Sequence, residues 1–131
     1  MQERYLPIFT YGTLRQGEVN HRLIEGKIKK RQMATLNNAV MYHLGDMPGI
    51  IEGDGTIHGE LVHINEKDYN EVLKDVDKLE GYDKTEDSLY LRLIKSVNLK
   101  NEDRSVKAWV YFYNKNLARK EKIKSNDWKI K

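Results

Sequence analysis

The chain contains no cysteine among its 131 residues. Disulfide bonds, catalysis by a thiol and metal sites built on cysteine thiolates are therefore excluded. Disulfides are rare in the reducing cytosol, so the absence agrees with a cytoplasmic location without establishing it.

Long apolar segments are also missing. The N-terminal residues Met1–Tyr5 include no apolar core of signal-peptide length. No apolar run approaches the roughly 20 residues that a membrane-spanning helix needs. We therefore expect a soluble, cytoplasmic protein with no membrane partner.

Most of the chain has no excess of charge of one sign. Lys and Arg number 23, Asp and Glu number 20, and the formal net charge is +3. The exception is a basic C-terminal tail over residues 115–131, which contains Lys115, Arg119, Lys120, Lys122, Lys124, Lys129 and Lys131. Such a tail is typical of nucleic-acid or anionic-surface binding, or of a solvated, solubilising end. Because Trp128 is its only aromatic residue, we favour the solvated end and do not expect a nucleic-acid partner.

The sequence shows neither an internal repeat nor a low-complexity linker, so we expect one domain over residues 1–131. Apolar runs and apolar–polar alternation predict strands within 6–9, 34–44, 56–64, 90–99 and 106–113. Residues 46–55, with Pro48 and three glycines, are interpreted as a loop. The polar segment 101–104 is interpreted as a hairpin turn.

Two segments have the pattern of helices. Residues 19–24 predict a short helix that ends before Gly26. A longer helix follows Asn65, a candidate N-cap, and ends at Gly81. Its apolar stripe consists of Tyr69, Val72, Leu73, Val76 and Leu79. Many strands and few helices predict an α+β fold, with a small, mostly antiparallel or mixed, barrel-like sheet and flanking helices.

The segment 9–17 is the first candidate for a binding site. A strand that ends in a glycine turn leaves backbone N–H groups unpaired, and these can bind a carboxylate or an oxyanion. Gly12 lets a ligand approach the backbone closely. Taken alone, such a segment is more often an ordinary turn than a binding site.

Glu80 is the second candidate. It follows the last residue of the helical stripe, where the helix dipole disfavours a negative charge. Together with partial burial, this position predicts a pKa raised toward neutrality, which suits a general base acting on an ammonium group. The alternative is an exposed acid that pairs with Lys78 or Lys84.

Five pieces in chain order resemble the gamma-glutamylcyclotransferase-like family, in particular its bacterial, gamma-glutamylamine cyclotransferase-like branch. The pieces are Tyr11-Gly12-Thr13-Leu14 followed by Gly17 and Asn20-His21, the strand Gly55–Val62 with Gly59-Glu60-Leu61, the helix end Val76–Tyr82, Tyr90-Leu91-Arg92, and Ala108-Trp109-Val110-Tyr111. Ser125-Asn126-Asp127-Trp128 also resembles a C-terminal Ser-Gly-Asp-Trp of many bacterial members, with Asn126 in place of glycine. Asn tolerates the left-handed backbone that glycine adopts, so this difference does not weaken the match.

The resemblance implies a specific reaction. Members of known activity cyclise a gamma-glutamyl group: its α-amine attacks the γ-carbonyl carbon, and 5-oxoproline leaves together with a free amine or amino acid. Glu80 is then the catalytic acid/base, and Tyr11, Gly12, Thr13 and Leu14 hold the glutamyl part of a small-molecule substrate. Because the nucleophile belongs to the substrate, neither a cofactor nor a metal is expected.

Tyr111, Arg92 and the histidines are further residues whose roles the sequence addresses. The resemblance places Tyr111 near the substrate and Arg92 near the core, and for Arg92 we favour a structural ion pair. The four histidines lack ligand spacing, since His58 and His63 face opposite sides of their predicted strand.

Two alternatives stay open at this point. The chain is an enzyme, or it is a non-catalytic member of the same fold that binds a small acidic ligand. The leaving amine and the oligomeric state are not determined by the sequence.

Overall fold

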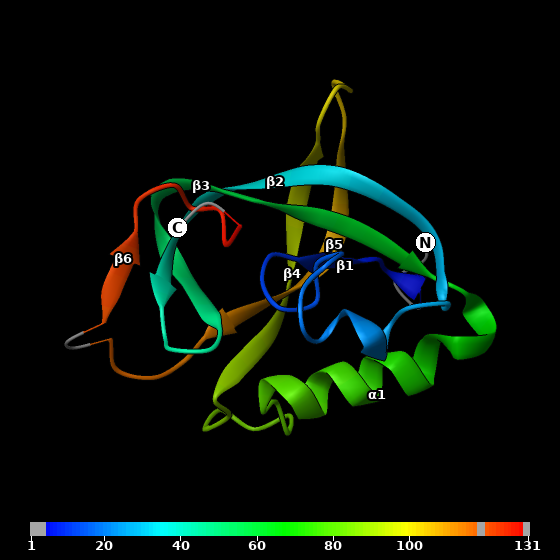
Figure 1. Ribbon diagram of the computed structural model, residues 1–131, viewed down its shortest axis with the longest axis horizontal. Helices are drawn as coiled ribbons and strands as arrows, with labels where there is room; N and C mark the ends of the chain where they lie inside the picture. The colour runs from blue at the N-terminus through cyan, green and yellow to red at the C-terminus, as the bar shows by residue number, and fades with distance from the viewer. Residues whose placement is uncertain (1–4, 118–119, 130–131) are drawn as a thin grey trace.

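Five strands close into a barrel in the computed structural model, which describes residues 5–117 and 120–129 (Figure 1). They are β1 (Ile8–Thr10), β2 (Ile28–His43), β3 (Pro48–Ile64), β4 (Tyr90–Leu99) and β5 (Ser105–Tyr113). Their order is β3-β1-β5-β4-β2, and pairing of β2 with β3 closes the ring. β1 and β5 are parallel, and the other pairs are antiparallel. The predicted α+β class with a mixed, barrel-like sheet is confirmed.

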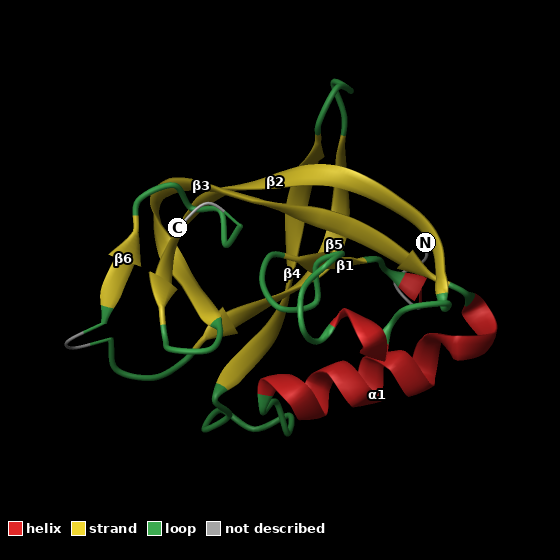
Figure 2. Ribbon diagram, viewed as in Figure 1, coloured by secondary structure: helices red, strands yellow, loops and turns green. Residues whose placement is uncertain are grey.

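The helix α1 (Tyr69–Glu80) lies along one side of this barrel (Figure 2). Strand β3 is buried on both faces where it lies between the barrel interior and α1. Ile57 and Leu61 belong to the apolar cluster inside the barrel, whereas Val62 packs with Val72 and Val76 of α1 in a second cluster. The predicted helical stripe is therefore the surface that attaches α1 to the barrel.

The ends of α1 follow from local sequence. The 3₁₀ helix η3 (Glu66–Asp68) precedes it, so Asn65 caps η3 rather than α1 itself. Gly81 ends the helix with φ of +69°, and its N–H donates to the carbonyl oxygens of Asp77 and Lys78. A residue without Cβ adopts this left-handed backbone easily, as the sequence predicted. Of the short helix predicted over 19–24, only the 3₁₀ turn η2 (His21–Leu23) forms.

The loop predicted over residues 46–55 is wrong. Strand β3 begins at Pro48, and the connection to β2 is the tight turn 44–47, closed by the Leu44 N–H and the Met47 carbonyl. The glycines here serve packing rather than turning. A Cβ on Gly53 would lie 2.9 Å from the Val40 side chain, and one on Gly55 would lie 2.8 Å from the Ala39 carbonyl oxygen.

The C-terminal segment folds back onto the barrel. Strand β6 (Glu121–Ile123) pairs with the end of β2, and Trp128 is buried in the inner cluster. Asn126 adopts φ of +54°, as expected for a residue in place of glycine. Arg119 and Lys131 of the predicted basic tail lie outside the described residues. Within the described part of the chain, no helix is long and apolar enough to cross a membrane.

Candidate active site

A small pocket lies between the end of β1 and the end of α1. The six residues predicted for the site all line it, namely Tyr11, Gly12, Thr13, Leu14, Glu80 and Tyr111. Met47 and Pro48, from the turn between β2 and β3, line it as well. The structure thus brings together residues up to 100 positions apart, and adds Met47 and Pro48, which no sequence pattern indicated.

The loop that follows β1 is fixed by its own hydrogen bonds. Arg15 N–H donates to the Gly12 carbonyl at 3.0 Å, and Asn20 bonds Thr13 through both its backbone N–H and its side-chain amide. The His21 ring bonds the Leu14 carbonyl through Nδ1 at 2.9 Å. The Gly12, Thr13 and Leu14 N–H groups donate no hydrogen bond to another described residue. They are therefore the unpaired donors that a strand ending in a glycine turn was predicted to supply.

Buried charges anchor this loop from behind. Arg15, which is buried, pairs with Glu60 of β3 at 3.3 Å and with Asp127 of the C-terminal segment at 2.8 Å. Glu60 also accepts a hydrogen bond from the Gln16 N–H and lies 3.6 Å from Arg31. Since Glu60 is occupied by these partners and does not line the pocket, it is a structural carboxylate. The Gly-Glu-Leu and Asn-Asp-Trp pieces of the sequence therefore meet at one anchor.

Glu80 is the pocket's carboxylate. It is the last residue of α1, with 9% of its surface exposed. Among the described residues, none donates a hydrogen bond to its carboxylate or forms an ion pair with it, so the predicted alternative of pairing with Lys78 or Lys84 does not occur. Burial, and secondly the negative charge of Asp77, raise the pKa of Glu80 to about 8.

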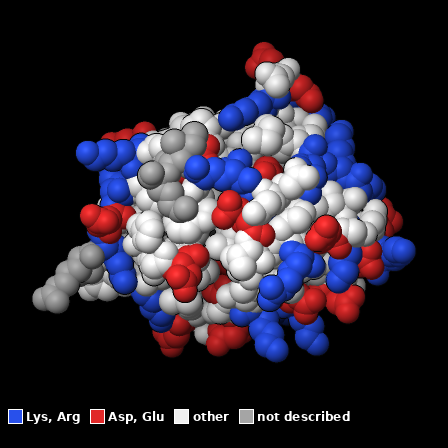
Figure 3. All heavy atoms as spheres, in the orientation of Figure 1, with Lys and Arg blue, Asp and Glu red and all other residues white. Residues whose placement is uncertain are grey.

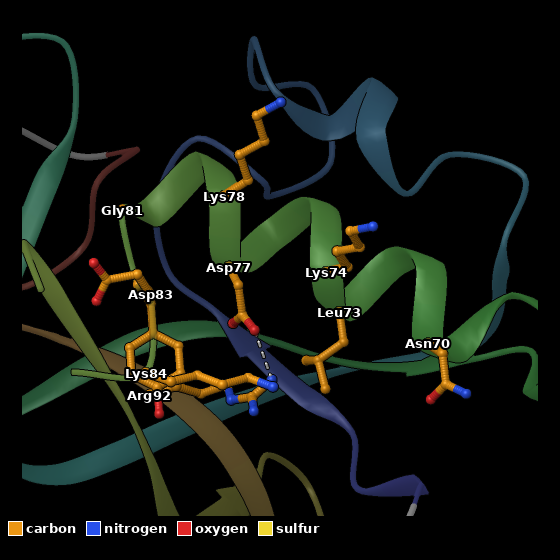
Figure 4. A pocket seen from close by; sticks show the side chains of 10 residues that line it. Asn70, Leu73, Lys74, Asp77, Lys78, Gly81, Asp83, Lys84 and Arg92 are labelled. Atoms are coloured by element: carbon orange, nitrogen blue, oxygen red, sulfur yellow. Dashed lines mark hydrogen bonds and ion pairs between the residues drawn. The ribbon is translucent and has the colours of Figure 1, made fainter.

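Asp77 lies one helical turn before Glu80 and connects three elements. Its Oδ1 accepts a hydrogen bond from the Tyr111 hydroxyl at 2.5 Å, and its Oδ2 from Arg92 at 3.1 Å. Figure 4 shows the Asp77 side chain directed from α1 toward Arg92. The ion pair favoured for Arg92 is confirmed. Tyr111, 3% exposed, touches both the pocket and this ion pair, and burial raises its pKa far above the ordinary value.

Two features of the pocket were missed by sequence reasoning. Pro48 covers Gly12 so closely that a Cβ on Gly12 would lie 2.6 Å from the proline Cγ. Tyr11 donates from its hydroxyl to the Tyr111 carbonyl at 2.6 Å and so joins the two sides of the pocket. For Asp77 a signal did exist, because residues three apart on a helix are neighbours on its surface.

The pocket is nearly closed. Its volume is about 20 Å³, enough for roughly one water molecule. In the described residues, no group of three or more His, Asp or Glu side chains is placed to hold a metal ion. The arrangement offers one unpaired carboxylate facing a loop with unpaired N–H donors.

The chain is similar to proteins of one family over almost its whole length. The family described as "Gamma-glutamyl cyclotransferase, AIG2-like" matches residues 8–130. A "Putative gamma-glutamylcyclotransferase" of Vibrio cholerae is 30% identical over 123 residues, which cover 92% of this chain and 93% of that protein. The "Gamma-L-glutamyl-butirosin B gamma-glutamyl cyclotransferase" of Niallia circulans is 28% identical over 124 residues, covering 93% of this chain and 74% of that protein.

Solved structures give the same picture. The solution structure of protein ytfP from Escherichia coli superimposes with a TM-score of 0.60 at 26% identity, covering 94% of this chain and 96% of that one. The crystal structure of the uncharacterized protein PH0828 from Pyrococcus horikoshii has a TM-score of 0.67 at 22% identity, covering 94% and 89%. At that identity the second likeness shows the fold alone.

Proposed function

Because this chain belongs to the gamma-glutamyl cyclotransferase, AIG2-like family, we propose that it cyclises the gamma-glutamyl group of a small substrate, releasing 5-oxoproline and a free amine or amino acid. The names of its relatives support gamma-glutamylcyclotransferase-type activity in general. The particular reaction is proposed from the site. The observation that carries it is the buried, unpaired Glu80 carboxylate facing the loop 11–14.

Glu80 is proposed as the general acid/base. The attacking α-amine of the substrate is an ammonium in solution and has no free lone pair until it loses a proton. A carboxylate with a pKa of about 8 is much closer in basicity to the substrate's α-amine than is an ordinary glutamate, whose pKa is about 4.3. Proton transfer between the two is then nearly balanced, and the same group can return the proton to the leaving amine.

The loop 11–14 is proposed to hold the glutamyl part. The N–H groups of Gly12, Thr13 and Leu14 are donors for its anionic oxygens, and the rings of Tyr11 and Tyr111 form the walls. The nucleophile is the substrate's own amine, so the proposed steps use no cofactor.

Substrate binding is expected to displace the Met47–Pro48 turn. Ligand sites typically enclose about 300–1,000 Å³, far more than the roughly 20 Å³ found here. Of the elements around the pocket, the turn 44–47 is the short surface connection, whereas β1 and β5 are held in the barrel. We therefore expect the substrate to enter between Gly12 and Pro48.

The test is a panel of gamma-glutamyl compounds, each scored for release of 5-oxoproline by the purified protein. Their leaving groups are simple amines, amino acids or the ε-amine of lysine. Release from at least one class supports the proposal. Binding of gamma-glutamyl compounds without release would instead support the non-catalytic alternative, a small acidic-ligand-binding protein. Neither binding nor release would contradict both.

A further inference from the structure

A larger groove runs along α1 and past its C-terminal end. This helix-side groove has a volume of about 760 Å³ and is formed by Leu73, Lys74 and Asp77 of α1 with Tyr82, Lys84 and Arg92 (Figure 4). Its size lies within the range of small-molecule sites. Neither Glu80 nor the loop 11–14, to which the cyclisation steps are assigned above, lines it.

Arg92 lines the groove, and one of its nitrogens has no hydrogen-bond partner among the described residues. One of its terminal nitrogens pairs with Asp77, and the guanidinium lies over the rings of Trp109 and Tyr82, at 4.4 and 5.3 Å from their centroids. Its Nε is buried and has no hydrogen-bond partner among the described residues. A buried donor without a partner is unfavourable, so an acceptor that reaches Arg92 is stabilised there.

The groove carries an excess of positive charge. Asp77 faces both Arg92 and Lys84, whose charges each lower its pKa against the effect of burial, and Lys74 stands at the rim. The other lining acid, Asp83, accepts hydrogen bonds from Thr85 and Ser88 within its own loop. Lys78 points away from Asp77 and Arg92 (Figure 4). The lining therefore carries four basic side chains, those of Lys74, Lys78, Lys84 and Arg92, against the two carboxylates of Asp77 and Asp83.

The backbone holds Lys84 in position. Its φ of +70° is uncommon for a residue with a Cβ, and the hydrogen bonds of Asp83 to Thr85 and Ser88 fix the loop around it. Such a conformation persists only where its surroundings enforce it, and it is found preferentially at functional sites. Leu73 and Tyr82 add apolar surface beside these cations.

We propose that the helix-side groove binds a small carboxylate-bearing molecule, with the carboxylate against Arg92, Lys74 and Lys84 and the apolar body against Leu73 and Tyr82. Two sources supply this chemistry. The carboxylate belongs either to a separate ligand or to the leaving amine of the substrate, whose scissile bond would lie one helical turn away at Glu80. The second source rests on the proposed function, and the first does not.

Binding is tested on the full chain with phenylacetate and its uncharged analogue phenylacetamide, followed by amide NMR shifts. We expect phenylacetate to bind with a dissociation constant of about 1 mM or tighter and to shift the amides of Leu73, Lys84 and Arg92. The double variant Lys74→Ala/Lys84→Ala should weaken binding by about fivefold or more, whereas Lys107→Ala, on β5 outside the groove, should not. Equal binding of the two compounds, shifts mapping elsewhere, or no shift at about 10 mM would overturn the proposal.

Turnover of two gamma-glutamyl compounds decides whether the bound carboxylate belongs to a separate ligand or to the leaving amine of the substrate. Gamma-glutamylalanine and gamma-glutamylethylamine differ on the leaving side by one carboxylate. If the groove receives the leaving amine, the wild type prefers the alanine compound in kcat/KM, and the double variant loses that preference. If the ligand is separate, the double variant cleaves both compounds like the wild type but binds phenylacetate more weakly. If neither compound is cleaved, the proposed function is in doubt, while the binding measurement still decides the groove.

Discussion

At the scale of single residues, Glu80 is held in a position that opposes its ionisation. The sequence predicts a raised pKa from the helix dipole together with partial burial. The structure confirms the rise, but attributes it first to burial and then to Asp77. Burial raises the pKa of Asp77 as well, and the hydrogen bond from the Tyr111 hydroxyl and the charge of Arg92 oppose that rise. The pair therefore separates two roles, with Asp77 as a positioning residue and Glu80 as the proposed acid/base.

Removing the charge of Asp77 should shift the pH dependence of the reaction. In Asp77→Asn the negative charge that disfavours ionisation of Glu80 is lost, so Glu80 deprotonates at lower pH. We expect the acid limb of the kcat/KM profile to move to lower pH, but to stay above the pH of an ordinary glutamate because burial, the larger cause of the raised pKa, remains. The control is Asp75→Asn on the same helix, which should leave the profile in place. An unchanged or upward-shifted limb in Asp77→Asn would exclude this electrostatic role.

The same pKa predicts how stability depends on pH. Glu80 has a folded-state pKa of about 8, above the 4.5 of an unperturbed group, so the folded state binds more protons between these values. Its contribution is thus fully present below about pH 4.5 and is lost as the pH rises through about 8. Glu80→Gln should match the wild type near pH 4.5 and exceed it in free energy of unfolding above pH 8, by on the order of a few kcal/mol.

Urea denaturation at both ends of that pH window measures the effect. Glu71→Gln, an exposed position on the same helix, serves as the control and should show no such difference. If Glu80→Gln loses stability at high pH, Glu80 is a paired residue that holds the helix end, and the unpaired carboxylate is not the correct description.

At the scale of elements, the predictable parts were those with a local cause. The stripe of α1, its end at Gly81 and the strand β4 over residues 90–99 follow from spacing and from single residues. The start of β3 was missed because Pro48 and the glycines at 49, 53 and 55 normally indicate a loop. Here Gly53 and Gly55 are required by contacts with β2, which involve residues distant in sequence.

The candidate site also has parts that local sequence indicates and parts that depend on contacts between distant residues. Glu80 and the loop 11–14 were identified from motifs in order, whereas the covering turn with Met47 and Pro48 was not. The anchor of the loop also escaped prediction, because Arg15, Glu60 and Asp127 come together only in the folded chain. No local pattern distinguishes such buried pairs from the other charged residues.

The contact between Gly12 and Pro48 gives a prediction at this scale. Gly12→Ala places a Cβ where Pro48 lies, at 2.6 Å from its Cγ, so the turn must move. We expect a loss of stability of about 1–3 kcal/mol and weaker substrate binding.

A double-mutant cycle isolates the cause. Pro48→Ala removes the colliding ring atoms, so Gly12→Ala/Pro48→Ala should lose less stability than the sum of the single variants. Strict additivity would mean that Gly12 is needed for another reason.

At the scale of the whole molecule, closure of the barrel makes the site. The parallel pair β1–β5 places Tyr11 beside Tyr111, and the stripe of α1 places Glu80 opposite. The C-terminal segment, which was expected to be a solvated tail, instead contributes β6, the buried Trp128 and the partner of Arg15. Basic and acidic side chains are interspersed over the face in Figure 3. The absence of a nucleic-acid partner stays a prediction. A single domain over residues 1–131 stays a prediction.

The central claim is that Glu80 transfers the protons of a cyclisation, and turnover by Glu80→Gln tests it most directly. Glutamine keeps the size of the side chain but exchanges no proton near neutral pH. With a gamma-glutamyl compound that the wild type cleaves, we predict a loss in kcat of roughly 10²–10⁴-fold, with little change in substrate affinity because the loop 11–14 holds the glutamyl part. Turnover close to that of the wild type would contradict the account and transfer the role of the base to another residue.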